Sequence, residues 1–364
     1  MTGIYIHVPF CKRKCPYCDF YSVCRPELYE GYTQAVCRNI EAFKGRDIKC
    51  DTIYFGGGTP SVLSAEQVDR IIDTAGKCFD LCKPEITMEA NPSSVDREKM
   101  LGWRKAGVTR LSFGVQSANG FLGRLHDFSQ AKSAVETAAQ VGFRHISCDI
   151  MLGVKGQTLE SLWDSIESLT ALPVDHISAY MLKIEKGTAF DCDEMRNAVA
   201  DDDMLCDMYL QTVGQLASKG FLQYEISNFA KKGGKSRHNL KYWHGEEYIG
   251  IGPSAHSFFD NERYYCKSDV EEFISDKVQS MVVLEDDPDK AEEYVMLGLR
   301  LTEGIDIGKA EELGGKELGE NIRKKAALFQ KQGLCVVEKG ILRLTPADFW
   351  LQTLLSVNCC GKPV

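Results

Sequence analysis

Short runs of apolar and β-branched residues alternate with longer amphipathic stretches through the first half of the chain. The predicted strands are residues 4–8, 52–55, 85–88, 110–115, 146–151 and 176–181. The predicted helices are residues 28–43, 65–79, 96–105, 131–141 and 159–171. Ser64 and Gln67 form a capping-box pattern at the start of the second helix. Strands that alternate with helices in this way favour an α/β fold with a parallel sheet, either open or curled into a partial barrel.

Chemically unusual residues stand at or near the ends of five predicted strands. A cysteine-rich loop follows the first strand, and residues 56–58, all glycine, follow the second. Glu89, Gln116 and Asp149 lie at or near the ends of the next three. Taken singly, the glycines suit an ordinary strand-to-helix turn, and the other three suit surface or capping positions. Because the carboxyl ends of parallel strands meet on one face, their combination favours a barrel with a binding site there.

The loop after the first strand holds Cys11, Cys15 and Cys18 in the spacing C-x3-C-x2-C. Three thiolates on one tight loop can each bind a different iron of a [4Fe–4S] cluster, which leaves the fourth iron open for a small chelating ligand. The basic residues at positions 12–14 offset the negative charge of such a cluster. The alternative is a structural zinc site with His7 as the fourth ligand. Zinc sites usually combine C-x2-C with a second, distant pair, and the sequence has no suitable second pair.

The pattern changes in the second half of the chain. Residues 185–203 are acidic and irregular, residues 204–219 are predicted as a helix, and residues 221–260 carry a second set of polar motifs. Helical stretches 290–301 and 316–332 then precede two short strands around a Lys-Gly turn, which is typical of a winged-helix-like module. We expect a partial (β/α)6 barrel over residues 1–220, a small α+β extension over residues 221–287, and a winged-helix-like domain over residues 288–364.

Charge and cysteine content limit the kinds of partner and the cellular compartment that we expect. The 364-residue chain has a formal net charge of -9, which gives no general attraction to nucleic acid. No segment approaches the roughly 20 apolar residues that cross a bilayer, and residues 1–8 are too short for a signal peptide. Fifteen cysteines in a chain without an export signal favour reduced thiols and a metal site over disulfides. We therefore expect a cytoplasmic protein.

Three motifs occur together in the order seen in one known family. The segment Tyr5-Ile-His-Val-Pro-Phe-Cys11, the C-x3-C-x2-C loop and Gly-Gly-Gly-Thr59-Pro resemble the radical S-adenosylmethionine (SAM) proteins related to oxygen-independent coproporphyrinogen III oxidase. The resemblance implies a radical SAM barrel whose three loop cysteines hold the cluster while SAM binds the open iron. It also implies SAM contacts from Tyr5, Tyr17, Gly57, Gly58, Thr59, Glu89, Gln116, Arg124 and Asp149. The stretch after Gln116 is a few residues shorter than usual in this family. The spacing from Gln116 to Arg124 therefore departs from the family pattern.

Two departures distinguish the chain from the oxidases of this family. The oxidases continue with C-x-C after the third cysteine, whereas Cys18 is followed by Asp19 and Phe20. The chain also starts ten residues before Cys11, so we expect no N-terminal extension of the kind that contributes to the oxidase active site. Both features resemble the heme-carrying branch of the family.

The segment His238-Asn-Leu-Lys-Tyr242-Trp243 matches the H-N-x-x-Y-W heme-binding motif of that branch. Neutral imidazole is a good axial ligand for heme iron, and the rings of Tyr242 and Trp243 suit a porphyrin face. Spacing alone favours a packed turn whose histidine satisfies a buried polar group, and the resemblance reverses that preference. It implies a heme chaperone that delivers heme to an acceptor, such as a membrane-bound respiratory enzyme, with an electron donor for the cluster. The alternative is oxidative decarboxylation of coproporphyrinogen III in porphyrin biosynthesis.

Overall fold

The computed structural model describes residues 1–116, 122 and 127–346. Its centre is a run of parallel strands that pair in sequence order from β1 to β6. These strands are β1 (Thr2–Val8), β2 (Lys49–Gly57), β3 (Asp80–Ala90), β4 (Arg110–Gln116), β5 (His145–Leu152) and β6 (His176–Met181). Each lies where the alternation predicts a strand. Strand β3 begins before the predicted residue 85 because residues 80 and 81 pair with residues 49 and 50 of β2.

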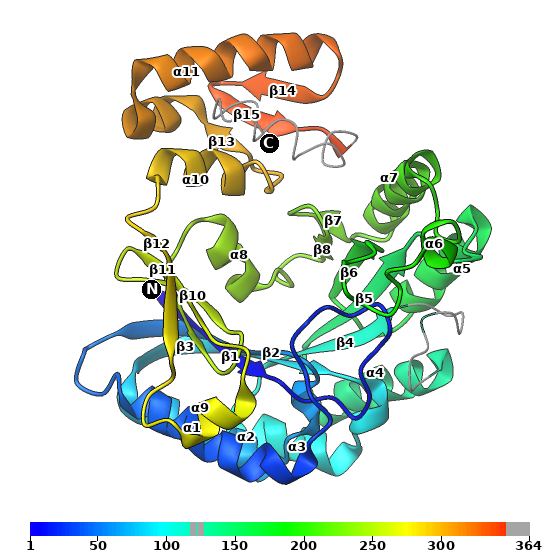
Figure 1. The fold of residues 1–364 in the computed structure, drawn as a ribbon. Helices are drawn as coiled ribbons and strands as arrows, with labels where there is room; N and C mark the ends of the chain where they lie inside the picture. Colours follow the sequence, from blue (N-terminus) through cyan, green and yellow to red (C-terminus); the bar gives the residue numbers. More distant parts are fainter. Residues whose placement is uncertain (117–121, 123–126, 347–364) are drawn as a thin grey trace.

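Helices that follow these strands cover the convex face of the curved sheet (Figure 1). They are α1 (Tyr29–Glu41), α2 (Ala65–Cys78), α3 (Arg97–Ala106), α4 (Phe128–Val141) and α5 (Leu159–Thr170). The predicted capping box of α2 is present, because Ser64 accepts from the Gln67 N–H and the Gln67 side chain accepts from the Ser64 N–H. Helix α4 begins earlier than the predicted residue 131, because Asp127 accepts from the Gln130 N–H and caps the helix there.

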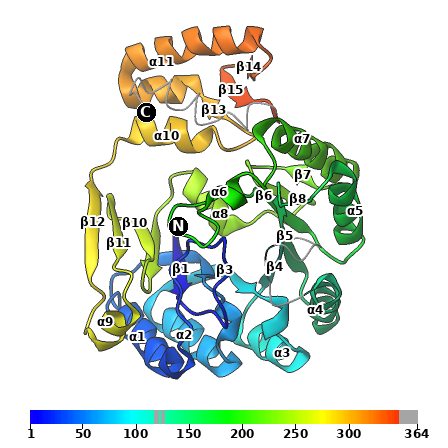
Figure 2. The same cartoon turned by 45° about the vertical axis from the view of Figure 1, so that its right-hand side comes forward.

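Residues 222–286 add strands to both edges of this sheet. Strands β7 (Leu222–Gln223) and β8 (Asn228–Ala230) extend the β6 edge in antiparallel orientation. At the other edge β9 (Tyr248–Ile251) runs parallel to β1, followed by antiparallel β10 (His256–Phe259), β11 (Glu262–Cys266) and β12 (Met281–Asp286). The described residues thus form a 12-stranded sheet in the order β12-β11-β10-β9-β1-β2-β3-β4-β5-β6-β8-β7 (Figure 2). The segment predicted as an extension therefore flanks the parallel strands on both sides.

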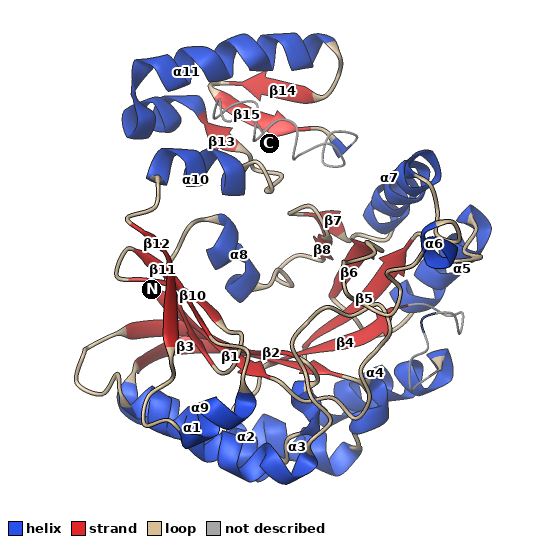
Figure 3. Cartoon of the chain, in the orientation of Figure 1, coloured by secondary structure: helices blue, strands red, loops and turns tan. Residues whose placement is uncertain are grey.

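Helix α8 (Arg237–Trp243) lies on the concave side of the sheet, which we call the lumen (Figures 1 and 3). Ser236 caps this helix by accepting from the Asn239 N–H. The remaining helices before the C-terminal unit are α6 (Asp193–Arg196), α7 (Asp202–Ser218) and α9 (Val270–Ser275). Short 3-10 helices at Pro26–Leu28, Pro60–Val62 and Pro92–Ser94 each begin with proline, whose fixed φ suits a first helical position.

The C-terminal unit consists of two helices and a small antiparallel sheet. Its elements are α10 (Lys290–Gly298), β13 (Ile305–Asp306), α11 (Ile307–Lys331), β14 (Cys335–Glu338) and β15 (Ile341–Leu344). The strands pair in the order β13-β15-β14, and the predicted Lys339-Gly340 turn joins β14 to β15, with positive φ at both residues. Helix α11 is longer than predicted, because it continues on both sides of a kink at Gly315, whose φ is 85°.

One cluster of buried apolar side chains runs between the sheet and its outer helices and continues into the C-terminal unit. It includes Ile4, Ile53 and Leu342, all at most 1% exposed. Burying an aliphatic side chain of this size stabilises a fold by about 1.5–3 kcal/mol, so this layer holds the strand ends in place. Across the described ranges, no helix is both long and apolar enough to cross a membrane.

Candidate functional site

The cysteine loop leaves the carboxyl end of β1 and is pinned on two sides. Phe10 forms a bridge with Val23, and the Cys11 N–H donates to Val23 O at 3.1 Å. On the other side Cys11 Sγ lies 3.3 Å from Thr59 Oγ1, just beyond β2. The three predicted cysteine ligands are all partly exposed. The fold therefore brings the cysteine loop and the glycine-rich segment to the same end of the sheet.

The three thiols share one loop, and two of them raise the pKa of the third. Among the described residues, no group of three or more Cys, His, Asp or Glu side chains is gathered closely enough to hold a metal ion. Burial raises the pKa of the Cys18 thiol, Cys11 and Cys15 raise it further, and Lys14 opposes the shift. The donor set, three thiols on one loop, fits a cluster that keeps one iron without a protein ligand, but the side chains would have to move together to bind it, so cluster binding stays a prediction.

His7, the fourth ligand of the zinc alternative, is committed elsewhere. Its side chain is 3% exposed, and burial lowers its pKa to about 4, so the ring is neutral at pH 7. Nε2 donates to Tyr21 O at 3.1 Å, so Nδ1 accepts from the Tyr5 hydroxyl at 3.1 Å. Because both nitrogens are used, His7 has no lone pair to offer a metal in this arrangement.

The glycines after β2 allow the backbone to pass close to β1. Gly57 has a φ of 107°, and a Cβ there would lie 2.7 Å from the His7 ring. A Cβ at Gly58 would lie 2.7 Å from Phe10 O. The N–H groups of Gly58 and Thr59 donate to Val8 O and Phe10 O, at 2.9 and 2.7 Å. The backbone N–H groups of these two residues are therefore used within the fold. The ammonium group of SAM is itself a donor, so it would be bound here by backbone carbonyl oxygens.

Glu89 and Asp149 face the lumen from β3 and β5. Glu89 accepts from the Tyr54 hydroxyl at 2.8 Å and from the Gly57 N–H. Burial, and then the nearby Asp149, raise its pKa to about 7. Asp149 accepts from the Ser112 hydroxyl at 3.2 Å. Two carboxylates therefore line the same cavity from β3 and β5, with β4 between these strands.

Of the remaining predicted SAM contacts, Gln116 and Tyr17 lie in the described part of the chain. Gln116 ends β4 with a φ of 69°, and its buried Oε1 has no hydrogen-bond partner in the described part of the chain. An orphaned buried acceptor of this kind fits a bound polar ligand. Tyr17 packs instead against Phe190, with ring centroids 6.2 Å apart. Arg124 lies outside the described residues.

Further polar side chains, which the sequence analysis missed, line a small cavity in the lumen together with Glu89 and Asp149. They include Thr87, Arg110, Ser112, Ser147, His176 and Ser178. Along β3 to β6 they alternate with buried apolar residues that face the outer helices. That period-two alternation is the signal that would have identified them, because successive side chains of a strand point to opposite faces.

His238 of the predicted heme motif is buried in the lumen. Nδ1 lies 2.8 Å from Thr52 Oγ1 and Nε2 lies 2.8 Å from the Tyr242 hydroxyl. The ring stacks on Tyr54 and Tyr5, with centroid distances of 5.1 and 6.4 Å, and burial lowers its pKa to about 3. This is the geometry of the packed-histidine alternative. Coordination of heme iron by His238 stays a prediction, and it requires the ring to leave these partners.

Trp243, at the end of the same motif, contacts the C-terminal unit. The guanidinium of Arg300 lies 4.3 Å from the centroid of its ring. The indole Nε1 is buried and has no hydrogen-bond partner within the described ranges. Tyr242 meets the ring of Tyr248 edge-on, at a centroid distance of 4.6 Å. The aromatic surfaces of the motif are therefore partly covered in this arrangement.

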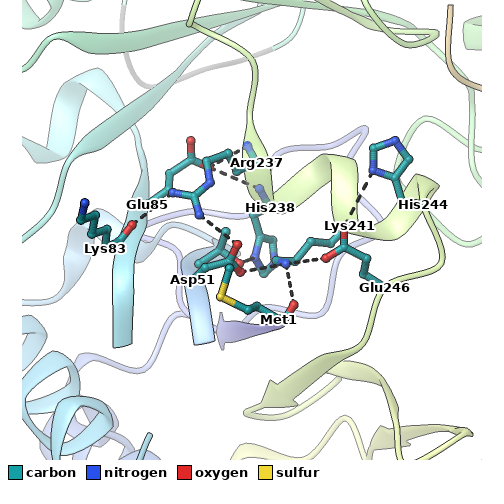
Figure 4. Close-up of polar contacts among 10 residues, drawn as sticks. Met1, Asp51, Lys83, Glu85, Arg237, His238, Lys241, His244 and Glu246 are labelled. Carbon is teal, nitrogen blue, oxygen red and sulfur yellow. Dashed lines mark hydrogen bonds and ion pairs between the residues drawn. The ribbon is translucent and has the colours of Figure 1, made fainter. Parts of the chain in front are cut away.

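Charged side chains anchor α8 to β2 and to the first residue of the chain (Figure 4). Lys241, which is 3% exposed, lies 2.8 Å from both Asp51 and Glu246 and donates to Met1 O at 2.6 Å. Arg237 lies 2.9 Å from Asp51. Although burial opposes the shift, Lys241 and Arg237 lower the pKa of Asp51. These contacts hold the heme motif against the sheet.

Comparison with known proteins agrees with the motifs. The family model of the Radical SAM superfamily matches residues 5–169, and that of the HemN C-terminal domain matches residues 286–351. The heme chaperone HemW of Bacillus subtilis is 33% identical over 372 residues, which cover 96% of this chain and 95% of that protein. The heme chaperone HemW of Escherichia coli is 39% identical over 265 residues, 70% of this chain and 69% of that protein.

Among solved structures, coproporphyrinogen III oxidase (HemN) from Escherichia coli resembles this fold with a TM-score of 0.80. The likeness covers 98% of this chain and 89% of that one, and at 19% identity it concerns the fold alone. The fold, the cysteine loop and the family matches define a HemN-like radical SAM protein, a class that implies a [4Fe–4S] cluster and SAM. Within that class, the chain belongs to the HemW family.

Proposed function

We propose that this protein is a heme chaperone that binds heme, carries a [4Fe–4S] cluster with exchangeable SAM, and passes heme to an acceptor protein. The observation that carries the proposal is the similarity to HemW proteins, which are described as heme chaperones, over nearly the full length of both chains. The absence of a C-x-C continuation after Cys18 supports it. A membrane-bound acceptor would bring this cytoplasmic protein to the membrane surface, and an electron donor would reduce the cluster.

In the proposed cofactor site, Cys11, Cys15 and Cys18 bind three irons of the cluster. When bound, the cluster supplies an open iron for SAM and an electron that can be passed to it. Glu89 and Asp149 accept hydrogen bonds from hydroxyl or ammonium groups of SAM. The remaining SAM contacts are proposed at Tyr5, Tyr17, Gly57, Gly58, Thr59, Gln116 and Arg124. The Oε1 atom of Gln116 supports a polar ligand at this site, because it is a buried acceptor without a hydrogen-bond donor among the described residues.

The proposed heme site involves His238, Tyr242 and Trp243. Coordination requires His238 Nε2 to exchange the Tyr242 hydroxyl for the iron. Helix α8 has only seven residues, and its release would break the contacts of His238 with Thr52 and of Lys241 with Asp51 in β2. We further propose that residues 1–220 form the partial (β/α)6 barrel, 221–287 its extension, and 288–364 a winged-helix-like domain.

Heme titration of anaerobically reconstituted protein tests the proposal. We expect wild type to give a Soret band that saturates, and His238→Ala to weaken binding by about tenfold, because an axial ligand is lost. His145→Ala is the matched control, since it removes a half-exposed imidazole that is hydrogen-bonded to Asp175, at the amino ends of β5 and β6. No band with wild type would refute the heme chaperone. A band that His238→Ala leaves unchanged would assign His238 to packing alone.

The same sample, given dithionite, SAM and coproporphyrinogen III, tests the alternative activity. We expect no protoporphyrinogen to form. Its formation at a steady rate would replace the chaperone proposal with oxidative decarboxylation. Running both assays on one preparation ensures that a poorly reconstituted cluster cannot be mistaken for either function.

A further inference from the structure

The C-terminal unit contacts the sheet beside the proposed heme motif, through the segment that joins α10 to β13. The Ile226 N–H, in the turn between β7 and β8, donates to Arg300 O at 3.1 Å. The Thr302 N–H donates to Tyr224 O at 3.1 Å. Figure 1 shows α8 between the concave face of the sheet and α10. These backbone contacts therefore fix the segment 300–303 next to the end of α8.

Two side chains of this segment contact the end of α8. The guanidinium of Arg300 lies 4.3 Å from the centroid of the Trp243 ring. Burial lowers the pKa of Arg300, so the cation is partly removed from water, where a cation–π contact is stronger. Glu303 Oε1 lies 2.7 Å from Nε2 of His244, the residue that follows α8 as its C-cap. The end of the helix is therefore tied to the C-terminal unit by one partly buried contact and one exposed contact.

The hydroxyl that occupies His238 Nε2 belongs to the same end of the helix. The Tyr242 hydroxyl lies 2.8 Å from Nε2, whereas Nδ1 lies 2.8 Å from Thr52 Oγ1 on β2. Heme iron needs only one imidazole nitrogen, so Nδ1 can keep its contact with Thr52 while Nε2 loses the Tyr242 hydroxyl. A shift of residues 242–244 is therefore sufficient to free Nε2, and the rest of α8 can stay on the sheet.

The position of residues 242–244 depends on these contacts. Trp243 Nε1 is buried and has no hydrogen-bond partner within the described ranges, and an unsatisfied buried donor disfavours such an arrangement. Gly245 follows with a φ of 63°, and a Cβ there would meet no atom within 4 Å apart from its chain neighbours. Packing therefore does not confine the chain after the helix. The contacts with Arg300 and Glu303 compensate an arrangement that the buried indole N–H disfavours.

We propose that the side chains of Arg300 and Glu303 form a latch on the heme motif. While the latch holds, the Tyr242 hydroxyl stays on His238 Nε2, and heme iron coordinates only in molecules in which the latch has released. The proposal rests on the proposed function, because it assumes His238 as the axial ligand, and it adds the regulation of that site by the C-terminal unit. The apparent affinity for heme is then the intrinsic affinity reduced by the fraction of released molecules.

Absorbance titration of the reconstituted full chain with heme tests the latch. Arg300→Gln should bind heme about 3–10-fold more tightly than wild type, because the cation–π contact is lost and the released fraction rises. Glu303→Gln should gain about twofold, as expected for an exposed ion pair. The matched control is Glu293→Gln, which removes a contact of α10 with Arg263 of β11 instead of α8, and it should bind like wild type. In the His238→Ala background, Arg300→Gln should give no gain.

Hydrogen exchange without heme measures the latch independently of the ligand. Mass spectrometry should show faster exchange in a peptide over residues 237–246 in Arg300→Gln and Glu303→Gln, by about the same factors as the gains in affinity, because exchange follows the population of the opened state. A peptide over residues 145–152, which form β5, should exchange as in wild type. Glu293→Gln should leave both peptides unchanged.

The outcomes separate the latch from the function on which it rests. If wild type binds no heme, the heme chaperone is refuted, and hydrogen exchange still decides whether the latch restrains α8. If wild type binds heme but the Arg300 and Glu303 variants fail to gain affinity, or do not exchange faster in α8, the latch alone is refuted. An equal gain in Glu293→Gln would also refute it, because any loosening of the C-terminal unit would then suffice. Should Arg300→Gln fail to fold, Glu303→Gln decides the question, since that side chain is 61% exposed.

Discussion

The Tyr54 hydroxyl donates to Glu89 Oε1 at 2.8 Å, and the same side chain stacks on His238, with ring centroids 5.1 Å apart. Tyr54 therefore touches both a proposed SAM contact and the proposed heme ligand. It lies within β2, away from the strand ends that drew attention in the sequence. A displacement of His238 in α8 would therefore alter the packing of Tyr54, which donates a hydrogen bond to the carboxylate that we propose for SAM.

Tyr54→Phe should change how SAM binding depends on pH. Burial and Asp149 raise the pKa of Glu89 to about 7, and the Tyr54 hydrogen bond opposes this rise. An ionised Glu89 is the better acceptor, so SAM affinity in wild type should increase as pH rises through about 7. Without the hydroxyl the pKa of Glu89 rises further, so the profile moves to higher pH. At pH 7 we expect binding about 3–10-fold weaker by calorimetry, with recovery toward pH 9.

Tyr294→Phe is the control for this measurement, because its hydroxyl accepts from the Asp306 N–H in the C-terminal unit. It should leave the SAM profile unchanged. A loss in Tyr54→Phe that is equal at every pH would show that Tyr54 acts by packing and not through the ionisation of Glu89.

Cys18→Ala should abolish the cluster, whereas Cys24→Ala should not. Cys18 is one of three proposed ligands on one loop, while Cys24 is exposed a few residues further on, outside the C-x3-C-x2-C spacing. After anaerobic reconstitution we expect iron and acid-labile sulfide to fall by about tenfold in Cys18→Ala, because a cubane needs its thiolates. Equal iron in both variants, or stoichiometric zinc in wild type, would contradict the cluster assignment.

Gly57→Ala should destabilise the protein, whereas Gly76→Ala should not. Gly57 has a φ of 107° and no room for a Cβ beside His7. Backbone strain of this kind costs about 1–3 kcal/mol. Gly76 lies in α2, where a Cβ would lie 3.7 Å from Leu81 in ordinary contact, and alanine should stabilise the helix by about 0.5–1 kcal/mol. Urea unfolding followed by circular dichroism measures both, and equal stability of the two variants would refute the strain.

Lys241→Met should destabilise the protein strongly because it leaves Asp51 buried with one cation fewer (Figure 4). Removing one partner of a buried pair typically costs about 3–5 kcal/mol. Asp51→Asn should cost less in the Lys241→Met background than in wild type, with a coupling energy of about 1–3 kcal/mol. Urea unfolding of the four proteins of this cycle measures the coupling. The exposed pair Lys77 and Asp73 is the control, and Lys77→Met should change stability by under about 0.5 kcal/mol.

Much of the parallel core was predictable from local pattern. The cysteine loop, the order of strands and helices and the capping box of α2 depend on residues that are neighbours in the chain, so periodicity and spacing are enough to predict them. Glu89, Gln116 and Asp149 were predicted as site residues because they lie at or near the ends of predicted strands and match the family pattern, and their contact with SAM stays a prediction. The period-two alternation of β3 and β4 places Thr87 and Arg110 on the polar face of the sheet, but only the curvature of the sheet brings that face around a cavity.

The edges of the sheet and the interior of the lumen depend on contacts between distant segments. Gly3 of β1 pairs with Tyr248 of β9, and His238 of α8 packs on Thr52 and Tyr54 of β2. No local periodicity records such pairs, because register and packing are chosen only when the whole chain is compact. Amino-acid order was therefore sufficient to predict the cysteine loop as a cluster site and to predict the layout of the β/α units. Only the tertiary structure decided two other features. The curved sheet buries the imidazole of His238 against Thr52, and it brings polar side chains of several strands around one cavity.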